Sequence, residues 1–273
     1  MNLKNLDRRW IFLFILLGVA IPLVVPIGFK LEVTKNVQTV YDLVANTPEN
    51  KAVLISFDYD PSSKPELQPM AVALVKQAIE KKQRVFCLAL WPMGSQMADD
   101  AFKMLKPEIK DLEYGVNFIN LGYKAGGIVT IQAIGKDFQK VFPTDSGGKA
   151  INSFPMVKGI KTLKDFAYIS SLSAGTPGLK EWIMIAKDKY DIPVTGGTTA
   201  VSTPGFLPYL NDQNQLTGLL GGLKNAAEYE FLVQRKGTAT SGMDAQSVSH
   251  IIIILFIVLG NIAFFTTKKK EKD

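Results

Sequence analysis

The chain has 273 residues, 47% hydrophobic and 21% charged, and its 31 basic and 25 acidic residues give a formal net charge of +6. This length suffices for one packed domain and leaves room for membrane segments. The single cysteine, Cys87, excludes an intrachain disulfide framework. Because His250 is the only histidine, Ser-His-Asp, Cys-His and His-rich zinc chemistry would need an imidazole from another chain.

The first element is an uncharged apolar run at residues 10–29, which follows Lys4, Arg8 and Arg9. About 20 helical residues cross a hydrocarbon core of roughly 30 Å, and a signal-peptide core is usually only about 7 to 15 residues long. We therefore predict a cytoplasmic N-terminus at 1–9 and a transmembrane helix at 10–29, with a cleaved signal peptide as the alternative. Pro22 and Pro26 should loosen the second half of this helix.

The middle of the chain alternates between strand-like apolar runs and helical periodicity. Residues 52–57 and 84–90 flank an amphipathic stretch at 65–83, which predicts a β-α-β unit. Further helices are expected at 97–112 and 177–190, and further strands at 116–122, 128–135, 166–172 and 192–197. This alternation predicts an α/β fold, a mostly parallel Rossmann-like sheet flanked by helices, between two transmembrane helices, with the soluble domain at 35–240.

Four predicted loops leave the carboxyl ends of strands, where open α/β sheets bind ligands. Their hydroxyls, glycines and backbone amides suit a carboxylate, sugar or phosphate. The alternative is that these residues only shape the loops, because glycine permits sharp turns and Ser, Thr and Pro begin helices in most such folds. The ligand-binding candidates are Asp58, Asp60, Ser62, Gly94, Ser173, Gly175, Thr195, Gly196, Gly197 and Thr198.

Asp58 and Asp60 are the best candidates for charge chemistry. Two residues apart on an extended strand, they would share a face and could converge on a cation or share a proton. Two carboxylates alone make a poor metal site, so no metal site is assigned. The alternative roles are a strand end for Asp58 and a turn before Pro61 for Asp60.

No recognisable catalytic or nucleotide-binding set is present. Ser173 lacks the first glycine of a G-x-S-x-G elbow and has no histidine base in the domain. Residues 195–200 lack the lysine of a P-loop, and no G-x-G-x-x-G follows a strand. No catalytic residue and no cofactor is therefore predicted.

Small residues in 218–232 suggest a helix face that allows close packing, with Gly218, Gly221 and Gly222 as interface candidates and packing on the domain's own sheet as the default. A tether is expected at 241–248 and a second transmembrane helix at 249–267. Asn261 within that helix is a candidate contact to another helix.

The distribution of lysine and arginine predicts on which side of the membrane the two termini lie. Four lysines in the tail at 268–273 follow the second apolar run, and no Lys or Arg lies in 237–250. Both termini should therefore be cytoplasmic and the main domain extracytoplasmic, at the cytoplasmic (inner) membrane. Apart from the membrane flanks the chain is nearly neutral, so no nucleic-acid partner is expected.

These observations favour a non-enzymatic domain that serves as an accessory or scaffold subunit of a membrane complex in transport or envelope function. Its expected partners are the lipid bilayer and other membrane-protein subunits or further copies of itself. The alternatives are a tethered small-ligand-binding domain and an Asp-dependent, cation-assisted enzyme.

Overall fold

The computed structural model describes residues 8–29 and 31–270. The chain forms two compact units: an α/β domain, Leu31–Arg235, and a helical unit made of the described residues of Met1–Lys30 and Lys236–Asp273.

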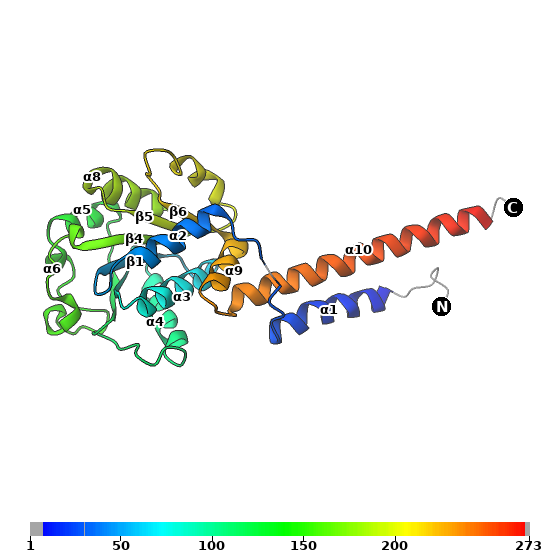
Figure 1. The fold of residues 1–273 in the computed structure, drawn as a ribbon, viewed down its shortest axis with the longest axis horizontal. Coiled ribbons are helices and arrows are strands. Elements are labelled where there is room, and N and C mark those ends of the chain that lie inside the picture. The colour runs from blue at the N-terminus through cyan, green and yellow to red at the C-terminus, as the bar shows by residue number, and fades with distance from the viewer. Residues whose placement is uncertain (1–7, 30, 271–273) are drawn as a thin grey trace. The chain divides into compact units, whose positions relative to one another are not determined.

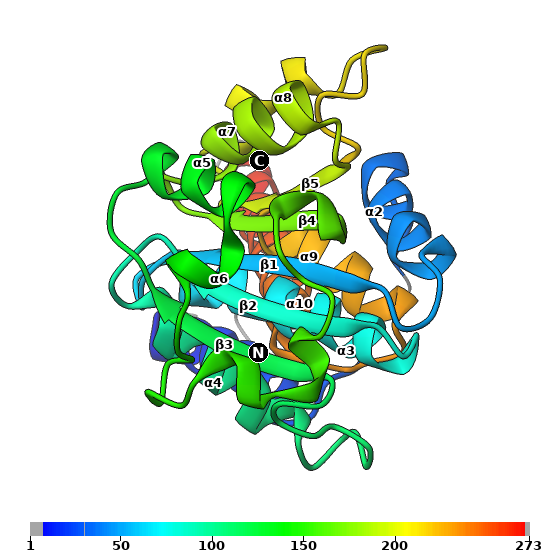
Figure 2. The same ribbon diagram turned by 90° about the vertical axis from the view of Figure 1, so that its left-hand side faces the viewer.

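The described part of the α/β domain contains a six-stranded sheet in which all paired strands are parallel. The strand order is β3-β2-β1-β4-β5-β6, and Figure 2 shows β5, β4, β1, β2 and β3 stacked in this sequence. The predicted α/β class and parallel sheet are confirmed. The strands are β1 (Ala52–Asp58), β2 (Arg84–Ala89), β3 (Phe118–Tyr123), β4 (Phe166–Ser173), β5 (Val194–Thr198) and β6 (Gly218–Gly221).

Helices cover both faces of the sheet. One layer contains α2 (Lys35–Asn46), α3 (Lys64–Glu80), α4 (Gly94–Leu105) and α9 (Gly222–Leu232). The other contains α5 (Ile128–Lys136), α6 (Phe138–Val141), α7 (Leu179–Trp182), a π-helical turn (Ile183–Lys187) and α8 (Asp188–Tyr190). Short 3₁₀ turns lie at Ile151–Ser153, Pro155–Val157, Leu163–Asp165 and Thr203–Tyr209.

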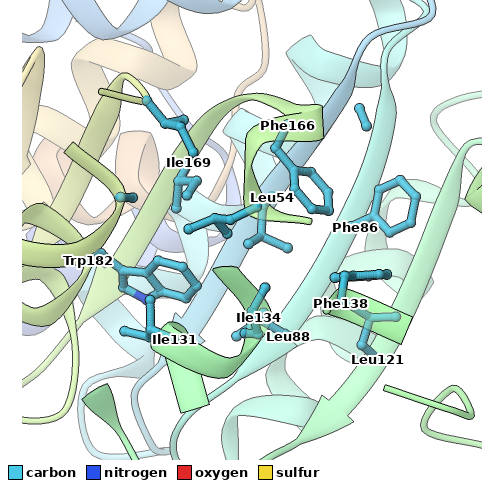
Figure 3. Packing of buried hydrophobic residues seen from close by; sticks show 14 of the residues in the cluster. Leu54, Phe86, Leu88, Leu121, Ile131, Ile134, Phe138, Phe166, Ile169 and Trp182 are labelled. Carbon is cyan, nitrogen blue, oxygen red and sulfur yellow. The ribbon is translucent and has the colours of Figure 1, made fainter. Parts of the chain in front are cut away.

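The core between the sheet and the second layer is apolar and aromatic. Figure 3 shows Leu54 of β1 and Phe86 of β2 facing Ile131 and Ile134 of α5 and Trp182 of α7. All five are fully buried, and full burial of a large apolar side chain contributes about 1.5–3 kcal/mol. This packing fixes the sheet face that carries the side chains of Ser56 and Asp58, because these residues lie two and four positions after Leu54 and share its face of β1.

Two predicted elements of the α/β domain have a different secondary structure in the folded chain. Residues 128–135, expected as a strand, belong to α5, where Ile131 and Ile134 are buried at helical spacing. Short β-branched apolar runs do not distinguish a strand from a buried helix by periodicity alone. Residues 218–221, expected within a helix, form β6, and α9 begins only at Gly222.

The helical unit contains α1 (Arg8–Val24) and α10 (Thr238–Lys270). Within the described residues, Thr238–Ile262 is long and apolar enough to cross a membrane, whereas Arg9–Val24 is a shorter apolar helix. The first apolar run is therefore helical only to Val24, two residues before Pro26. Residues 241–248, expected as a tether, continue α10 without a break.

The two helices of this unit pack antiparallel, side by side in Figure 1. The rings of Phe14 and Phe256 are 6.1 Å apart, and a Cβ on Gly18 would lie 2.3 Å from Cδ1 of Ile252. Beyond α1, the backbone amides of Gly28 and Phe29 donate to the buried carboxylate of Asp244, at 2.7 and 3.2 Å. This carboxylate ties the end of the first apolar run to α10.

Asp244→Ala should free these two amides. Loss of both hydrogen bonds is expected to speed hydrogen exchange at Gly28 and Phe29 at least about tenfold, since about 1.4 kcal/mol corresponds to a factor of ten. Hydrogen-exchange mass spectrometry of the full chain in mild detergent measures this, with Asp244→Asn, which keeps one acceptor oxygen, as the intermediate control. Unchanged exchange in Asp244→Ala would contradict the assignment.

Candidate functional site

The strand order reverses between β1 and β4, and open α/β sheets bind ligands outside the carboxyl ends of the strands at such a switch point. β1 ends at Asp58 and β4 at Ser173, which are paired in register. The loops after β1, β2 and β4 meet here, so this is the part of the sheet where a site is expected.

The Asp58 side chain is fully buried at this point and accepts four hydrogen bonds. Its Oδ1 accepts from the backbone amide of Leu90 at 2.8 Å. Its Oδ2 accepts from Oγ of Ser56 at 2.7 Å, Oγ of Ser171 at 3.2 Å and Nε1 of Trp182 at 3.3 Å. One carboxyl group therefore joins β1, the end of β2, β4 and α7.

Burial raises the pKa of Asp58 to about 7. The ionised carboxylate loses more solvation free energy on burial than its four hydrogen bonds restore. The Leu90 amide is the strongest of the opposing contributions, followed by Ser56, Trp182 and Ser171. A carboxyl group with this pKa can exchange a proton near neutral pH, but every oxygen is already in contact with protein donors.

Asp60 does not join Asp58. β1 ends at Asp58, so the two carboxylates do not share a strand face, and Asp60 lies in the exposed loop. Its Oδ1 accepts from Oγ of Ser62 at 2.6 Å and from the Ser62 amide at 3.0 Å. The Ser62 hydroxyl is the largest cause that lowers the pKa of Asp60. The two carboxylates, which could have converged on a cation or shared a proton, are thus separated, and Asp60 and Ser62 form a local turn.

Trp91 connects the loops that follow β2 and β4, across the end of β1. Its Nε1 donates to the carbonyl of Pro177 at 2.7 Å, and a Cβ on Gly175 would lie 3.3 Å from its ring. The Ser173 hydroxyl donates back to the Gly175 carbonyl at 2.7 Å. Ser173 and Gly175 therefore shape a loop that the chain's own indole packs against.

Gly94 begins α4 at a close contact with the sheet. A Cβ there would lie 1.8 Å from the carbonyl oxygen of Phe57 and 2.7 Å from Cβ of Ala89. A side chain at this position is incompatible with the present distance between α4 and β1, which explains the glycine by packing.

Gly94→Ala should consequently destabilise the α/β domain by about 2 kcal/mol or more, because the added methyl must displace backbone. Gly205→Ala is the matched control, because nothing lies within 4 Å of a Cβ there and its effect should stay within about 0.5 kcal/mol. Denaturant unfolding of both variants in the same detergent compares them. Equal stabilities would show that α4 does not sit this close to β1.

The candidates in 195–198 lie in β5 itself and not in a loop. The Thr195 hydroxyl is 2.7 Å from that of Ser170, and the Thr198 hydroxyl is 2.9 Å from that of Thr203. Gly196 and Gly197 lie against Leu179 and Leu172. All four of these residues are buried in β5, so they belong to the strand expected at 192–197, which continues to Thr198, and not to the loop that follows it.

The glycines proposed for an interface contact this chain. A Cβ on Gly218 would lie 2.6 Å from Val40 of α2, and one on Gly221 2.6 Å from Thr203. Gly222 has a φ of +64° and borders Ala200. Close packing within the domain therefore accounts for all three. Asn261 is exposed on α10, and its carboxamide makes no hydrogen bond within the part of the chain that the structure describes.

Sequence reasoning missed the partners of Asp58, above all Trp182 and Leu90. These residues are 124 and 32 positions away, and no local pattern connects them to β1. Ser56 could have been found, because it is two residues from Asp58 and shares its strand face.

Among the described residues, no group of three or more His, Cys, Asp or Glu side chains is placed to hold a metal ion. Comparison of the chain with protein-family models, with curated proteins and with solved structures finds no match.

Proposed function

We propose that this protein is a membrane-anchored, non-enzymatic α/β domain that serves as an accessory or scaffold subunit of a membrane complex. The observation that carries the proposal is the antiparallel pair of apolar helices, α1 and α10, whose outward side chains such as Phe12, Ile251 and Phe264 are exposed. Exposed apolar surface of this extent suits lipid or another helix.

The contacts at the switch point between β1 and β4 support the non-enzymatic part of the proposal. Asp58 is the best-placed carboxyl group for chemistry, and its oxygens are occupied by Leu90, Ser56, Ser171 and Trp182. Trp91 also bridges two of the surrounding loops. A substrate would have to displace several of these contacts before it reached the carboxyl group.

We further propose that both helices span the bilayer with both termini in the cytoplasm. The antiparallel pairing of α1 and α10 supports two spans, and the lysine-rich tail supports the orientation. Cys87 is buried, so the chain offers a low background for thiol labelling.

Single-cysteine labelling tests the orientation. Asp60→Cys lies on the exposed loop of the domain and Lys269→Cys in the tail. A membrane-impermeant maleimide should label Asp60→Cys in intact cells, and Lys269→Cys only after permeabilisation. Labelling of both in intact cells, or of neither, would contradict two spans with cytoplasmic ends.

The size and composition of the purified assembly test the scaffold role. The full chain in mild detergent should migrate as a complex with other membrane polypeptides or further copies, identified by mass spectrometry. Asn261→Leu should weaken this association about threefold, since a hydrogen bond between membrane helices contributes about 0.6 kcal/mol, whereas Ile257→Leu should not. A monomer without partners would refute the proposal, and a stabilising metabolite whose effect is lost in Ser173→Ala would favour a tethered binding domain.

A further inference from the structure

The lysines of the α/β domain are unevenly distributed. The domain as a whole is nearly neutral, with 22 basic and 21 acidic residues between Leu31 and Arg235. The segment from Lys124 to Lys164 nevertheless contains seven lysines and only two acidic residues, Asp137 and Asp145. The excess positive charge therefore belongs to the layer of α5, α6 and the 3₁₀ turns that lead into β4.

Several contacts connect these lysines into one surface. The Phe138 amide at the start of α6 donates to the carbonyl of Lys161 at 2.7 Å, next to Lys136 at the end of α5. Lys164 and Lys189 both lie over the ring of Tyr190, at 5.8 and 5.4 Å from its centroid. We call the exposed set the lysine face: Lys136, Lys140, Lys149, Lys158, Lys161, Lys164 and Lys189.

The hydroxyl of Tyr190 also borders Gly135 at the end of α5, which brings Lys164 and Lys189 beside Lys136. At the other end of the face, Lys149 lies 4.6 Å from the centroid of Phe154. A cavity of about 340 Å³ is lined by Phe154, Lys158, Gln139, Asn152 and Ser153, among other residues. The face therefore borders a hollow that is lined by both polar and apolar side chains.

Within the described residues, no lysine of the face forms an ion pair. The nearby carboxylates accept hydrogen bonds from other groups, including Asp188, whose Oδ1 accepts from Nε2 of Gln215 at 3.3 Å. Asp137 accepts from the backbone amide of Lys140, and Asp165 accepts from the amides of Lys161 and Thr162. Asp191 pairs with Lys187, which is not part of the face. Seven ammonium groups are thus available to a partner.

The lysine face lies on one of the two helical layers of the domain. Lys158, Lys161 and Lys164 precede β4 and Lys189 precedes β5, which places them at the amino edge of the sheet, opposite to the switch point. Both ends of the domain leave through the other layer, at Thr34 before α2 and at Arg235 after α9. The lysine face therefore lies on the layer of the domain opposite to the one through which both of its ends leave.

The side-chain chemistry of lysine restricts the kind of partner that the face can bind. Lysine is depleted in the cores of protein–protein interfaces, whereas it gains binding energy by releasing counterions from a densely charged polyanion. The seven side chains of the face are lysines, which offer point charges instead of the bidentate geometry that reads particular groups. Arg84 borders the face, but its Nη1 donates to the carbonyls of Met156 and Lys158. We propose that the lysine face binds a linear phosphate-bearing polymer in the aqueous phase on the domain's side of the membrane.

Binding of long-chain inorganic polyphosphate to the full chain in nanodiscs of zwitterionic lipid tests the proposal. Affinity should fall steeply as salt rises. The triple variant Lys136→Gln, Lys161→Gln, Lys164→Gln should bind at least about tenfold more weakly at low salt. The slope of log affinity against log salt should be smaller by about 2, because each lysine that neutralises a phosphate contributes about 0.7 to this slope.

The matched control is the triple variant Lys81→Gln, Lys103→Gln, Lys110→Gln. These lysines are equally exposed but lie in the other layer or its loops, and their replacement should change the affinity less than about twofold. Equal weakening in both triple variants would overturn the proposal. So would binding to anionic vesicles but not to polyphosphate, which would identify a lipid surface as the partner.

Discussion

Asp58→Ala is expected to lower the free energy of unfolding of the α/β domain by about 4 kcal/mol at pH 5. At this pH the folded carboxyl group is protonated, because burial raises its pKa to about 7. Alanine would leave the Leu90 amide and the Trp182 indole N–H buried without an acceptor, at about 1–3 kcal/mol each, and a small cavity would add to this. The hydroxyls of Ser56 and Ser171 can rotate to other acceptors and should add little.

Denaturant unfolding followed by tryptophan fluorescence in mild detergent measures the effect, since Trp182 itself contacts the mutated group. Asp58→Asn is the matched control, because its carbonyl oxygen keeps one acceptor and its volume is almost unchanged. It should stay within about 1 kcal/mol of the original protein at pH 5. If Asp58→Ala were equally mild, the carboxyl group would not be the link between β1, β2, β4 and α7.

Raising the pH from 5 to 8 should cost the original protein about 3 kcal/mol of stability through Asp58 alone. The folded-state pKa is about 7 and the unfolded-state value is near 3.8. Between these values the folded state binds a proton that the unfolded state does not, so stability falls as pH rises toward 7 and is level above it. Two pH units between 5 and 7 at 1.36 kcal/mol each give this magnitude of about 3 kcal/mol.

The comparison with Asp58→Asn isolates this group, since other carboxylates titrate alike in both proteins. The asparagine variant lacks the pH dependence, so it should become more stable than the original protein by about 2 kcal/mol at pH 8. Asp60, whose pKa is lowered, contributes in the opposite direction and cancels in the difference. A difference between the two proteins that did not change with pH would refute the raised pKa.

The charge of the domain shows a limit of counting residues. The nearly equal number of basic and acidic residues led to the expectation that no nucleic acid is bound. In the folded domain, lysines from α5, α6, the turns before β4 and α8 share one layer, while nearby carboxylates accept from backbone amides. Net charge does not record where charges lie after folding, and therefore it could not reveal the lysine face.

The sequence by itself determined the features that depend on local periodicity and on the length of apolar runs. The alternation of apolar strands and amphipathic helices predicted β1, α3, β2, β4, α7 and β5, because side-chain spacing is a local property. It also placed Asp58 at the carboxyl end of the first strand. It wrongly predicted a strand at 128–135, because a strand and a buried helix bury the same β-branched residues.

The tertiary structure alone decided what Asp58 contacts. Parallel pairing brought β4 beside β1 from more than a hundred residues away, and it aligned Ser171 with Ser56 and Ser173 with Asp58. The packing of α7 then placed the Trp182 indole on the same carboxylate. Such contacts depend on strand order and helix packing, which are set by the cooperative burial of the entire core and leave no trace in the spacing of neighbouring residues.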